Sequence, residues 1–351
     1  MVLAPHPDDE TLGAGIVLQQ ARAAGAAVRV VFATAGEANP WPQRWIERRW
    51  HLGADDRQRW GARRSAEARD ALSRLGIDPA AAVFMGWPDG GILPLLINDG
   101  DRAIAQLASL LAAFRPTRVI LPCIRDQHPD HSALNLITRA ALLGLDEQLN
   151  PLLLEFLLHA QRSARAALDW RQAASDDTLP TTKLAALEAH DTQLRLNRRW
   201  LLGRARAPEA FALATPASRE NAHDLGGESP VRESAITLSS SDDGCTRLQF
   251  DADHPSARRS RLALVLAGVS PGHIDMWRCA VDPDSANRGS ADITLTNCTN
   301  GALLGHADYF RDGSRVLLTL PRKLPGQLLY ARFARPRRRL QVIDRDVWEK
   351  L

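Results

Sequence analysis

The chain changes its pattern of hydrophobic and polar positions near Phe211. Before that point, short apolar runs alternate with amphipathic helical stretches. Residues 28–34 and 118–123 have the composition of buried strands, and residues 63–75 between them carry charges on one face and apolar side chains on the other. This alternation predicts an α/β fold over residues 1–215, a Rossmann-like, mostly parallel sheet with crossover helices.

The rest of the chain has a different texture. Residues 216–234 are rich in Arg, Pro, Gly, Asn and Ser without periodicity, which predicts a linker. Beyond it, short alternating runs are separated by turn residues, so residues 235–351 are expected to form a smaller all-β, sandwich-like accessory domain. The runs span residues 235–239, 246–250, 262–266, 274–281, 293–296, 316–320 and 328–333.

Composition excludes some functions. Of the 351 residues, 45% are hydrophobic and 24% charged, which is ordinary for a globular protein. A net charge of +3 does not predict a nucleic-acid partner. The basic run at residues 335–339 would suit phosphate or a peripheral contact with an anionic membrane, although such runs are usually solvated surface.

Cysteine and hydropathy patterns set the expected compartment. The four cysteines form no CxxC pair, so neither a thiolate zinc site nor a redox motif is predicted. No apolar stretch is long enough for a transmembrane segment, and the N-terminus lacks the charged and apolar regions of a signal peptide. We therefore expect a cytoplasmic protein.

The first chemical cluster contains His6, Asp8 and Asp9, which follow a short apolar strand and precede a helical stretch at residues 11–24. Open α/β sheets bind ligands at the carboxyl ends of their strands. Two carboxylates packed beside an imidazole repel each other unless they are neutralised, and a divalent cation neutralises them directly.

The second cluster contains His128, Asp130 and His131, placed behind the strand at residues 118–123 in the same way. Sites behind two parallel strands can converge in one crevice. His6, Asp9 and His131 would then form a site of two imidazoles and one carboxylate, which suits zinc with an open position for water. Iron, cobalt or manganese would suit the same ligands.

The remaining members of the two clusters fit catalytic roles. Asp8 is free to accept a proton from the bound water. His128, held by the Asp130 carboxylate, would as an imidazolium stabilise an oxyanion or protonate a leaving amine. Either cluster alone would equally suit an ordinary turn, but two clusters behind separate strands favour a functional site.

Both clusters resemble the AHPDDE and HxDH motifs of the de-N-acetylases that include the phosphatidylinositol-glycan class L and LmbE-like enzymes. The resemblance covers about residues 1–215. It implies that His6, Asp9 and His131 bind zinc, that Asp8 is the general base and that His128 assists at the oxyanion.

Further segments resemble the same family. Thr34 to Glu37 look like its TxGE turn, Arg64 with Glu67 like its RxxE helix, and Trp87 to Gly90 like its PDG loop. This resemblance implies that Asp89 holds sugar hydroxyls and that Arg64 meets a phosphate or sugar oxygen. Alternatively, Arg64 and Glu67 form a surface pair and Asp89 belongs to a plain turn.

Two later segments extend the resemblance. Residues 183–193 and 209–211 look like the family's K…AL…SQ and ExF segments, with Thr192 where serine is usual. Outside the motifs, His51, His159 and His190 belong to no cluster in the sequence, so we expect them to be structural or exposed.

The sequence therefore predicts a zinc-dependent hydrolase that removes an N-acetyl group from an N-acetylglucosamine-type sugar or glycoconjugate, giving an amine and acetate. The substrate is expected to be a small-molecule or lipid-linked amino sugar. Residues 38–60, with four tryptophans, form the expected specificity segment. The alternatives are an amidase on another amide-bearing sugar conjugate and a non-catalytic carbohydrate-binding protein.

Overall fold

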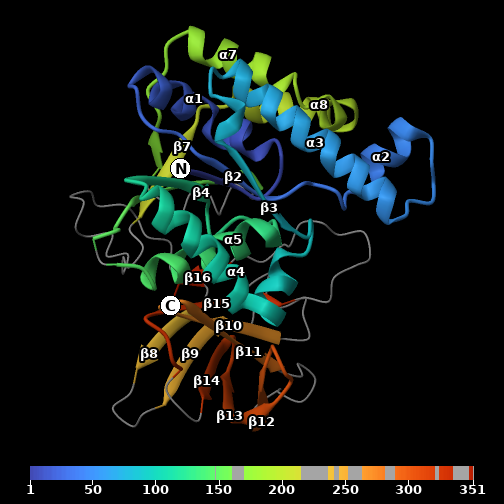
Figure 1. Cartoon of the computed structure of the whole chain (residues 1–351). Helices are drawn as coiled ribbons and strands as arrows, with labels where there is room; N and C mark the ends of the chain where they lie inside the picture. Colours follow the sequence, from blue (N-terminus) through green and yellow to red (C-terminus); the bar gives the residue numbers. More distant parts are fainter. Residues whose placement is uncertain are drawn as a thin grey trace. The chain divides into compact units, whose positions relative to one another are not determined.

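In the computed structural model, the N-terminal part of the chain forms a seven-stranded sheet in the order β3-β2-β1-β4-β5-β7-β6 (Figure 1). Strands β1 to β5 are parallel, β7 is antiparallel to β5, and β6 is antiparallel to β7. The structure describes residues 1–146, 148–159, 170–214, 236–240, 245–251, 263–280, 289–320, 324–334 and 348–350.

The elements of this first part alternate as the sequence predicts. Its strands are β1 (Val2–Ala4), β2 (Val30–Thr34), β3 (Ala82–Trp87), β4 (Arg118–Pro122), β5 (Leu152–Phe156), β6 (Trp170–Gln172) and β7 (Ala210–Ala214). Its helices are α1 (Asp9–Ala23), α2 (Pro40–Glu47), α3 (Ala54–Arg74), α4 (Ile92–Phe114), α5 (Pro129–Leu143), α7 (Thr178–Leu187), α8 (Asp191–Arg206) and the short 3-10 turn Pro79–Ala81.

The strand order places a topological switch point between β1 and β4. The chain runs from β1 outward to β2 and β3, then returns to β4 on the other side of β1. Connections at such a point leave the carboxyl ends of two neighbouring strands uncovered, which is where ligands bind in open α/β sheets. Both predicted motif clusters follow these two strands.

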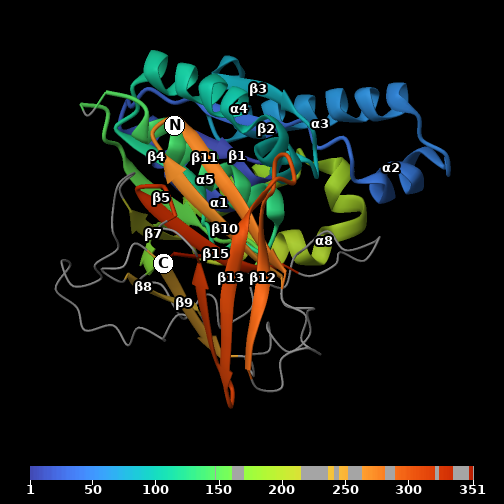
Figure 2. The same ribbon diagram turned by 90° about the horizontal axis from the view of Figure 1, so that it is seen from below.

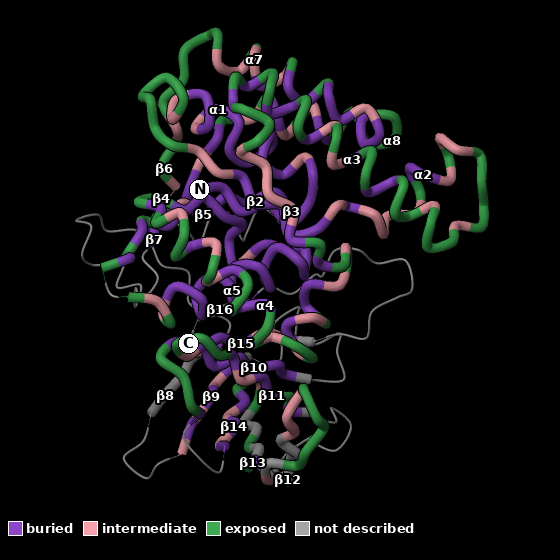
Figure 3. The backbone as a smooth tube through the Cα atoms, in the orientation of Figure 1, coloured by how far each residue is buried: buried purple, intermediate pink, exposed green. Residues whose placement is uncertain are grey.

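The core of the sheet is apolar on both sides of β1 and β2. Val2, Ala4, Val30 and Phe32 are almost completely buried and belong to one cluster with residues of α1, α3, α7 and α8. Figure 3 shows the central strands as continuously buried. Continuous burial explains why the sequence of these strands is an uninterrupted apolar run.

A buried ion pair fixes α1 against α7 and β7. Lys183 Nζ lies 2.7 Å from Glu209 Oε1 and donates to the carbonyl of Leu12 at 2.9 Å. The Glu209 carboxylate also accepts from the backbone N–H of Ile16 at 2.7 Å and of Val17 at 3.2 Å. Both side chains are buried, so removal of either one would leave the other as an uncompensated buried charge.

The C-terminal part is a nine-stranded antiparallel sheet in the order β16-β15-β10-β11-β12-β13-β14-β9-β8, seen from a second direction in Figure 2. Its strands are β8 (Ile236–Ser240), β9 (Thr246–Asp251), β10 (Ala263–Ser270), β11 (His273–Ala280), β12 (Gly289–Asn297), β13 (Leu303–Asp312), β14 (Arg315–Leu320), β15 (Leu328–Ala334) and β16 (Glu349–Lys350).

This second sheet folds over itself. Phe250 of β9 and Phe333 of β15 are separated by five strands in the sheet order, yet their ring centroids lie 5.3 Å apart in an edge-on contact. Both belong to one buried cluster with Trp277 of β11 and Leu318 of β14. A single curved sheet thus encloses its own core, and the predicted all-β, sandwich-like fold is confirmed.

The chain divides into two compact units. The first comprises residues 1–95, 111–135 and 149–216, and the second comprises residues 96–110, 136–148 and 217–351. The predicted domain boundaries stay a prediction, and the linker at residues 216–234 and the basic run at residues 335–339 lie outside the described residues. No helix in the described ranges is long and apolar enough to span a bilayer.

The Lys183–Glu209 pair gives a prediction for stability. Lys183→Met removes the ammonium and leaves a buried carboxylate without its counter-charge, so the free energy of unfolding should fall by about 3 to 5 kcal/mol. Urea denaturation followed by circular dichroism measures this change. The matched control is Arg195→Met, since Arg195 pairs with Asp191 at the surface and should contribute about 1 kcal/mol or less. Equal losses in the two variants would contradict this interpretation.

Candidate active site

Three predicted ligands meet at the switch point. His6 and Asp9 lie between β1 and the first turn of α1, and His131 lies in the first turn of α5. Asp9 Oδ2 is 3.1 Å from His6 Nδ1 and 3.3 Å from His131 Nε2. These side chains form one of the groups in which the possible ligand atoms all lie within 4.8 Å of one another. Two imidazoles and a carboxylate at this spacing can hold a metal ion.

The two nitrogens of His131 have different surroundings. Nδ1 lies 3.1 Å from Asp126 Oδ2, whereas the buried Nε2 makes no well-aligned hydrogen bond within the described residues and faces Asp9 Oδ2 at 3.3 Å. A metal-binding histidine typically donates its second N–H to a carboxylate, which fixes the tautomer and leaves the other nitrogen for the metal. The surroundings of His131 fit that pattern.

The buried carboxylates favour positive charge at this point. Burial opposes protonation of His131, but Asp126 and Asp9 outweigh it and raise the His131 pKa to about 10. Burial likewise opposes protonation of His6, yet contacts with Asp130, Asp89 and Asp9 raise its pKa well above the usual value. A divalent cation would supply the same positive charge to these carboxylates, so the donor set fits a metal.

Asp8 points to a different neighbour from Asp9. Its backbone has φ 125°, a conformation that is unusual for any residue except glycine. Its N–H donates to Glu10 Oε2 at 2.9 Å, and its carboxylate lies 3.5 Å from Arg64 Nη2. Burial raises the pKa of Asp8 to about 6, against the opposing effect of Arg64. The carboxylate is therefore a stronger base than an exposed aspartate.

Arg64 is buried behind the first motif. Its Nη1 donates to the carbonyl of Gly36 at 2.9 Å and its Nη2 to the carbonyl of Pro7 at 2.6 Å. Gly36 has φ +69°, and a Cβ there would lie only 1.9 Å from Arg64 Nη1. The guanidinium thus holds the motif loop and faces Asp8, and its predicted contact with substrate stays a prediction.

His128 is held through the main chain of Asp130. The Asp130 N–H donates to His128 Nδ1 at 3.2 Å, while the Asp130 carboxylate accepts from the N–H groups of Gly90 and Ile92 and contacts His6 Nε2. Burial, together with the charges of His6 and His131, lowers the His128 pKa well below its usual value. An Nδ1 that accepts the Asp130 N–H leaves a ring proton for Nε2, and this contact runs through the main chain of Asp130. The predicted role of His128 at the oxyanion stays a prediction.

Asp89 enters the site from the loop after β3. Its Oδ2 accepts from the Ala38 N–H at 2.7 Å, and its Oδ1 lies 3.2 Å from His6 Nε2. Burial opposes the charged form, but His6 outweighs it and lowers the Asp89 pKa far below its usual range. Glu37 accepts from the Asp89 N–H at 2.9 Å. A contact between Asp89 and sugar hydroxyls stays a prediction.

The structure brings in two residues for which the sequence indicated no role. Asp126 accepts from the backbone N–H groups of His128, Leu158 and His159. The ring centroid of His159 lies 4.9 Å from that of His131, and its ring stacks on Trp200 at 5.2 Å. His159, which belongs to no cluster in the sequence, thus lies beside the second motif cluster in the structure. The sequence signal that could have indicated this is the position of His159 just after β5, because β5 is the neighbour of β4 in the sheet.

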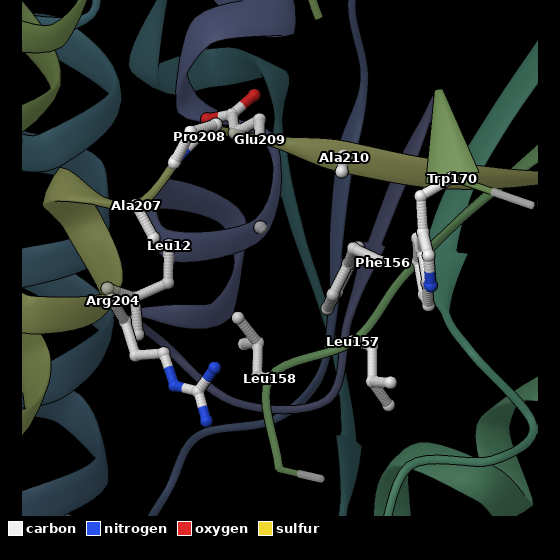
Figure 4. A pocket seen from close by; sticks show the side chains of 11 residues that line it. Leu12, Phe156, Leu157, Leu158, Trp170, Arg204, Ala207, Pro208, Glu209 and Ala210 are labelled. Atoms are coloured by element: carbon white, nitrogen blue, oxygen red, sulfur yellow. The ribbon is translucent and has the colours of Figure 1, made fainter. Parts of the chain in front are cut away.

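A separate pocket lies beside β5 and the start of α1. Figure 4 shows Leu12, Phe156 and Leu158 gathered in it, with the guanidinium of Arg204 at one edge. Its walls are mostly apolar, and none of the predicted site residues contributes to the lining described. The group of possible metal ligands therefore lies outside this pocket.

Comparisons with known proteins identify relatives of this chain. Residues 1–142 match the family model described as PIG-L, GlcNAc-PI de-N-acetylase. The chain is 30% identical over 234 residues to a 1D-myo-inositol 2-acetamido-2-deoxy-alpha-D-glucopyranoside deacetylase of Mycobacteroides abscessus, a match that covers 56% of this chain and 82% of the relative. A protein of the same name from Nocardia farcinica is 30% identical over 244 residues, covering 55% and 80%.

Among solved structures, the conserved protein TT1542 of Thermus thermophilus is 25% identical with a TM-score of 0.43, covering 61% of this chain and 93% of the other. The sequence matches determine the family. The match to the family model includes both motif clusters, and the relative from Mycobacteroides abscessus is covered over most of its length. The chain therefore belongs to the PIG-L family of GlcNAc-PI de-N-acetylases.

Proposed function

We propose that this protein is a zinc-dependent hydrolase that removes the N-acetyl group from an N-acetylglucosamine-type sugar or glycoconjugate. The observation that carries the proposal is the buried group of His131 Nε2, Asp9 and His6, with Asp126 holding the opposite nitrogen of His131. This is the arrangement of a ligand fixed in advance by a second layer of hydrogen bonds. The names of the relatives support deacetylation as the reaction.

His6, Asp9 and His131 would hold the metal. When bound there, zinc supplies Lewis-acid chemistry, because it polarises a carbonyl oxygen and lowers the pKa of water. The ligand set of two imidazoles and one carboxylate is typical of catalytic zinc sites. The choice of zinc over another divalent transition metal is part of the proposal.

Asp8 acts as the general base. Its half-buried carboxylate, with a pKa of about 6, accepts a proton from the attacking water as the water oxygen bonds to the amide carbon. Arg64, 3.5 Å away, keeps the carboxylate in place. The same proton then passes from Asp8 to the amide nitrogen as the C–N bond breaks, which gives a free amine and acetate.

His128 serves the oxyanion. Because its Nδ1 accepts the Asp130 N–H, the ring proton resides on Nε2 and can be donated to the negative oxygen that develops on the amide carbon. A neutral donor of this kind stabilises the oxyanion without needing to change its protonation state. We propose Asp130 as the residue that holds this tautomer and, through its carboxylate, orients His6.

The identity of the sugar rests on the relatives, whose names specify an acetamido sugar joined to inositol. The Asp89 carboxylate is proposed to accept hydrogen bonds from sugar hydroxyl groups. Arg64, which faces Asp8, is proposed to contact the substrate beside that carboxylate. An amidase acting on another sugar conjugate would use the same metal site with different surrounding loops. A cytoplasmic location stays a prediction from the sequence.

One assay separates these alternatives. Acetate release from N-acetylglucosamine-containing substrates, measured with and without a chelator, should be abolished by the chelator and restored by zinc. Turnover of other amides without acetate release would favour the amidase. Sugar binding without any hydrolysis would favour a non-catalytic protein and contradict the proposal.

Asp8→Asn tests the general base. The side chain keeps its size, and asparagine tolerates positive φ, but a carboxamide cannot accept the proton from water. We expect kcat to fall by about 10² to 10⁴-fold with metal content unchanged, measured by acetate release and by metal analysis of the purified protein. The matched control is Asp70→Asn on the exposed face of α3, which should change neither quantity. Loss of metal in Asp8→Asn would make Asp8 a ligand and overturn this assignment.

Asp126→Asn tests the support of the metal site. The amide replaces a carboxylate that accepts from His131 and three backbone N–H groups, so zinc affinity should fall by about 10 to 100-fold. Competition with a chromophoric chelator measures the affinity, and the absorption spectrum of the cobalt-substituted protein reports the ligand geometry. Unchanged affinity and spectrum in a folded variant would show that Asp126 has no part in metal binding.

A further inference from the structure

Three tryptophans of one short segment lie open to solvent. Trp41, Trp45 and Trp50 are 49%, 72% and 74% exposed, whereas Trp60 in the next helix is 1% exposed. Large aromatic side chains at such exposure are uncommon on soluble proteins and mark surfaces that meet something else. We call Trp41, Trp45 and Trp50, with Arg44, Arg48 and Arg49, the tryptophan–arginine surface.

The local fold presents these side chains outward. Asn39 caps α2 by accepting from the Trp41 N–H, Pro40 begins the helix, and Arg48 ends it with φ 54°. Trp41 and Trp45 are four residues apart and so share a helix face. The opposite face is anchored, because Gln43 is buried and its Nε2 donates to the carbonyl of Asp56 in α3 at 2.7 Å. This hydrogen bond fixes to α3 the side of α2 that lies opposite Trp41 and Trp45.

The charge of this segment is positive. Residues 38–60 contain five arginines and three carboxylates. Asp56 pairs with Arg49 and Arg59, and Glu47 pairs with Arg59, so Arg44, Arg48 and Arg57 lie outside these pairs. Arg44 lies 5.4 Å from the ring centroid of Trp41, and Arg48 is exposed. The surface thus offers aromatic rings and guanidinium groups together.

Aromatic rings together with guanidinium groups complement the surface of an anionic membrane. Tryptophan rings favour the headgroup level of a bilayer, where one side is apolar and the other wet. Guanidinium groups pair with lipid phosphates, and basic residues next to inserted aromatics strengthen binding to anionic membranes. A neutral glycan would not complement the excess of arginine, so charge favours the membrane.

We propose that the tryptophan–arginine surface binds the face of an anionic membrane. The same segment reaches the site, because Glu37 and Ala38, which hydrogen-bond Asp89, directly precede α2. Membrane binding through α2 would therefore hold the entrance of the site next to amphiphilic substrates whose sugar lies at the lipid surface. This last step rests on the proposed function, whereas vesicle binding itself requires neither metal nor catalysis.

The experiment is co-sedimentation of the full chain with vesicles of phosphatidylcholine alone or mixed with phosphatidylglycerol. We expect binding to the mixed vesicles, a blue shift of tryptophan fluorescence, and weakening by salt. The double variant Trp45→Ala with Trp50→Ala should bind about tenfold or more weakly. Arg48→Asn, which suits the positive φ, should weaken binding to the mixed vesicles alone.

The matched control is Phe310→Ala, since Phe310 of β13 is 54% exposed on the other sheet and should leave vesicle binding unchanged. Vesicle binding of the full chain should be the same with and without a chelator, so failure of the deacetylase proposal would leave the membrane result standing. Three outcomes would overturn the membrane proposal: no binding to mixed vesicles, fluorescence changes with N-acetylglucosamine oligomers that the variant loses, or a dimer that the variant abolishes.

Discussion

The burial of negative charge at one edge of the sheet is the constraint on which the rest of the site depends. Five aspartates converge there, and an unpaired carboxylate in such surroundings would be very costly. Each one is compensated by donors from a different segment of chain, so the carboxylates cross-link the loops that surround them. The five are Asp8, Asp9, Asp89, Asp126 and Asp130, and their donors include Arg64, the rings of His6 and His131, and the N–H groups of Ala38, Gly90, Ile92, His128, Leu158 and His159.

The same principle fixes the helix that carries the first motif. Glu10 is fully buried, and its carboxylate receives the Asp8 N–H, the Thr11 hydroxyl and the ring of His190. One turn further on, Glu209 and Lys183 engage the backbone of α1. Two buried polar clusters therefore hold the start of α1 in register with β1, which is the kind of rigid support that a metal site needs.

The sequence predicted what local pattern and spacing determine. The strands behind the two clusters, their convergence and the three possible ligands follow from apolar runs and short motifs. Strand β13 was not predicted, because Gly305, His306 and Asp308 interrupt its alternation, and α3 begins at Ala54, before the periodic stretch that indicated it. His159 and the contacts of Asp126 depend on the pairing of β5 with β4, which no local pattern encodes.

The two consecutive aspartates of the first motif show how the backbone separates their chemistry. Asp8 occupies the N-cap of α1 yet makes no capping hydrogen bond with its side chain. An ordinary cap would place the carboxylate on backbone N–H groups, and such bonds stabilise the charged form and lower its pKa. With φ 125°, Asp8 turns towards Arg64 instead, while Asp9 faces His6 and His131. The backbone conformation of Asp8 thus separates the two carboxylates: Asp8 faces Arg64, and Asp9 joins the group of possible metal ligands.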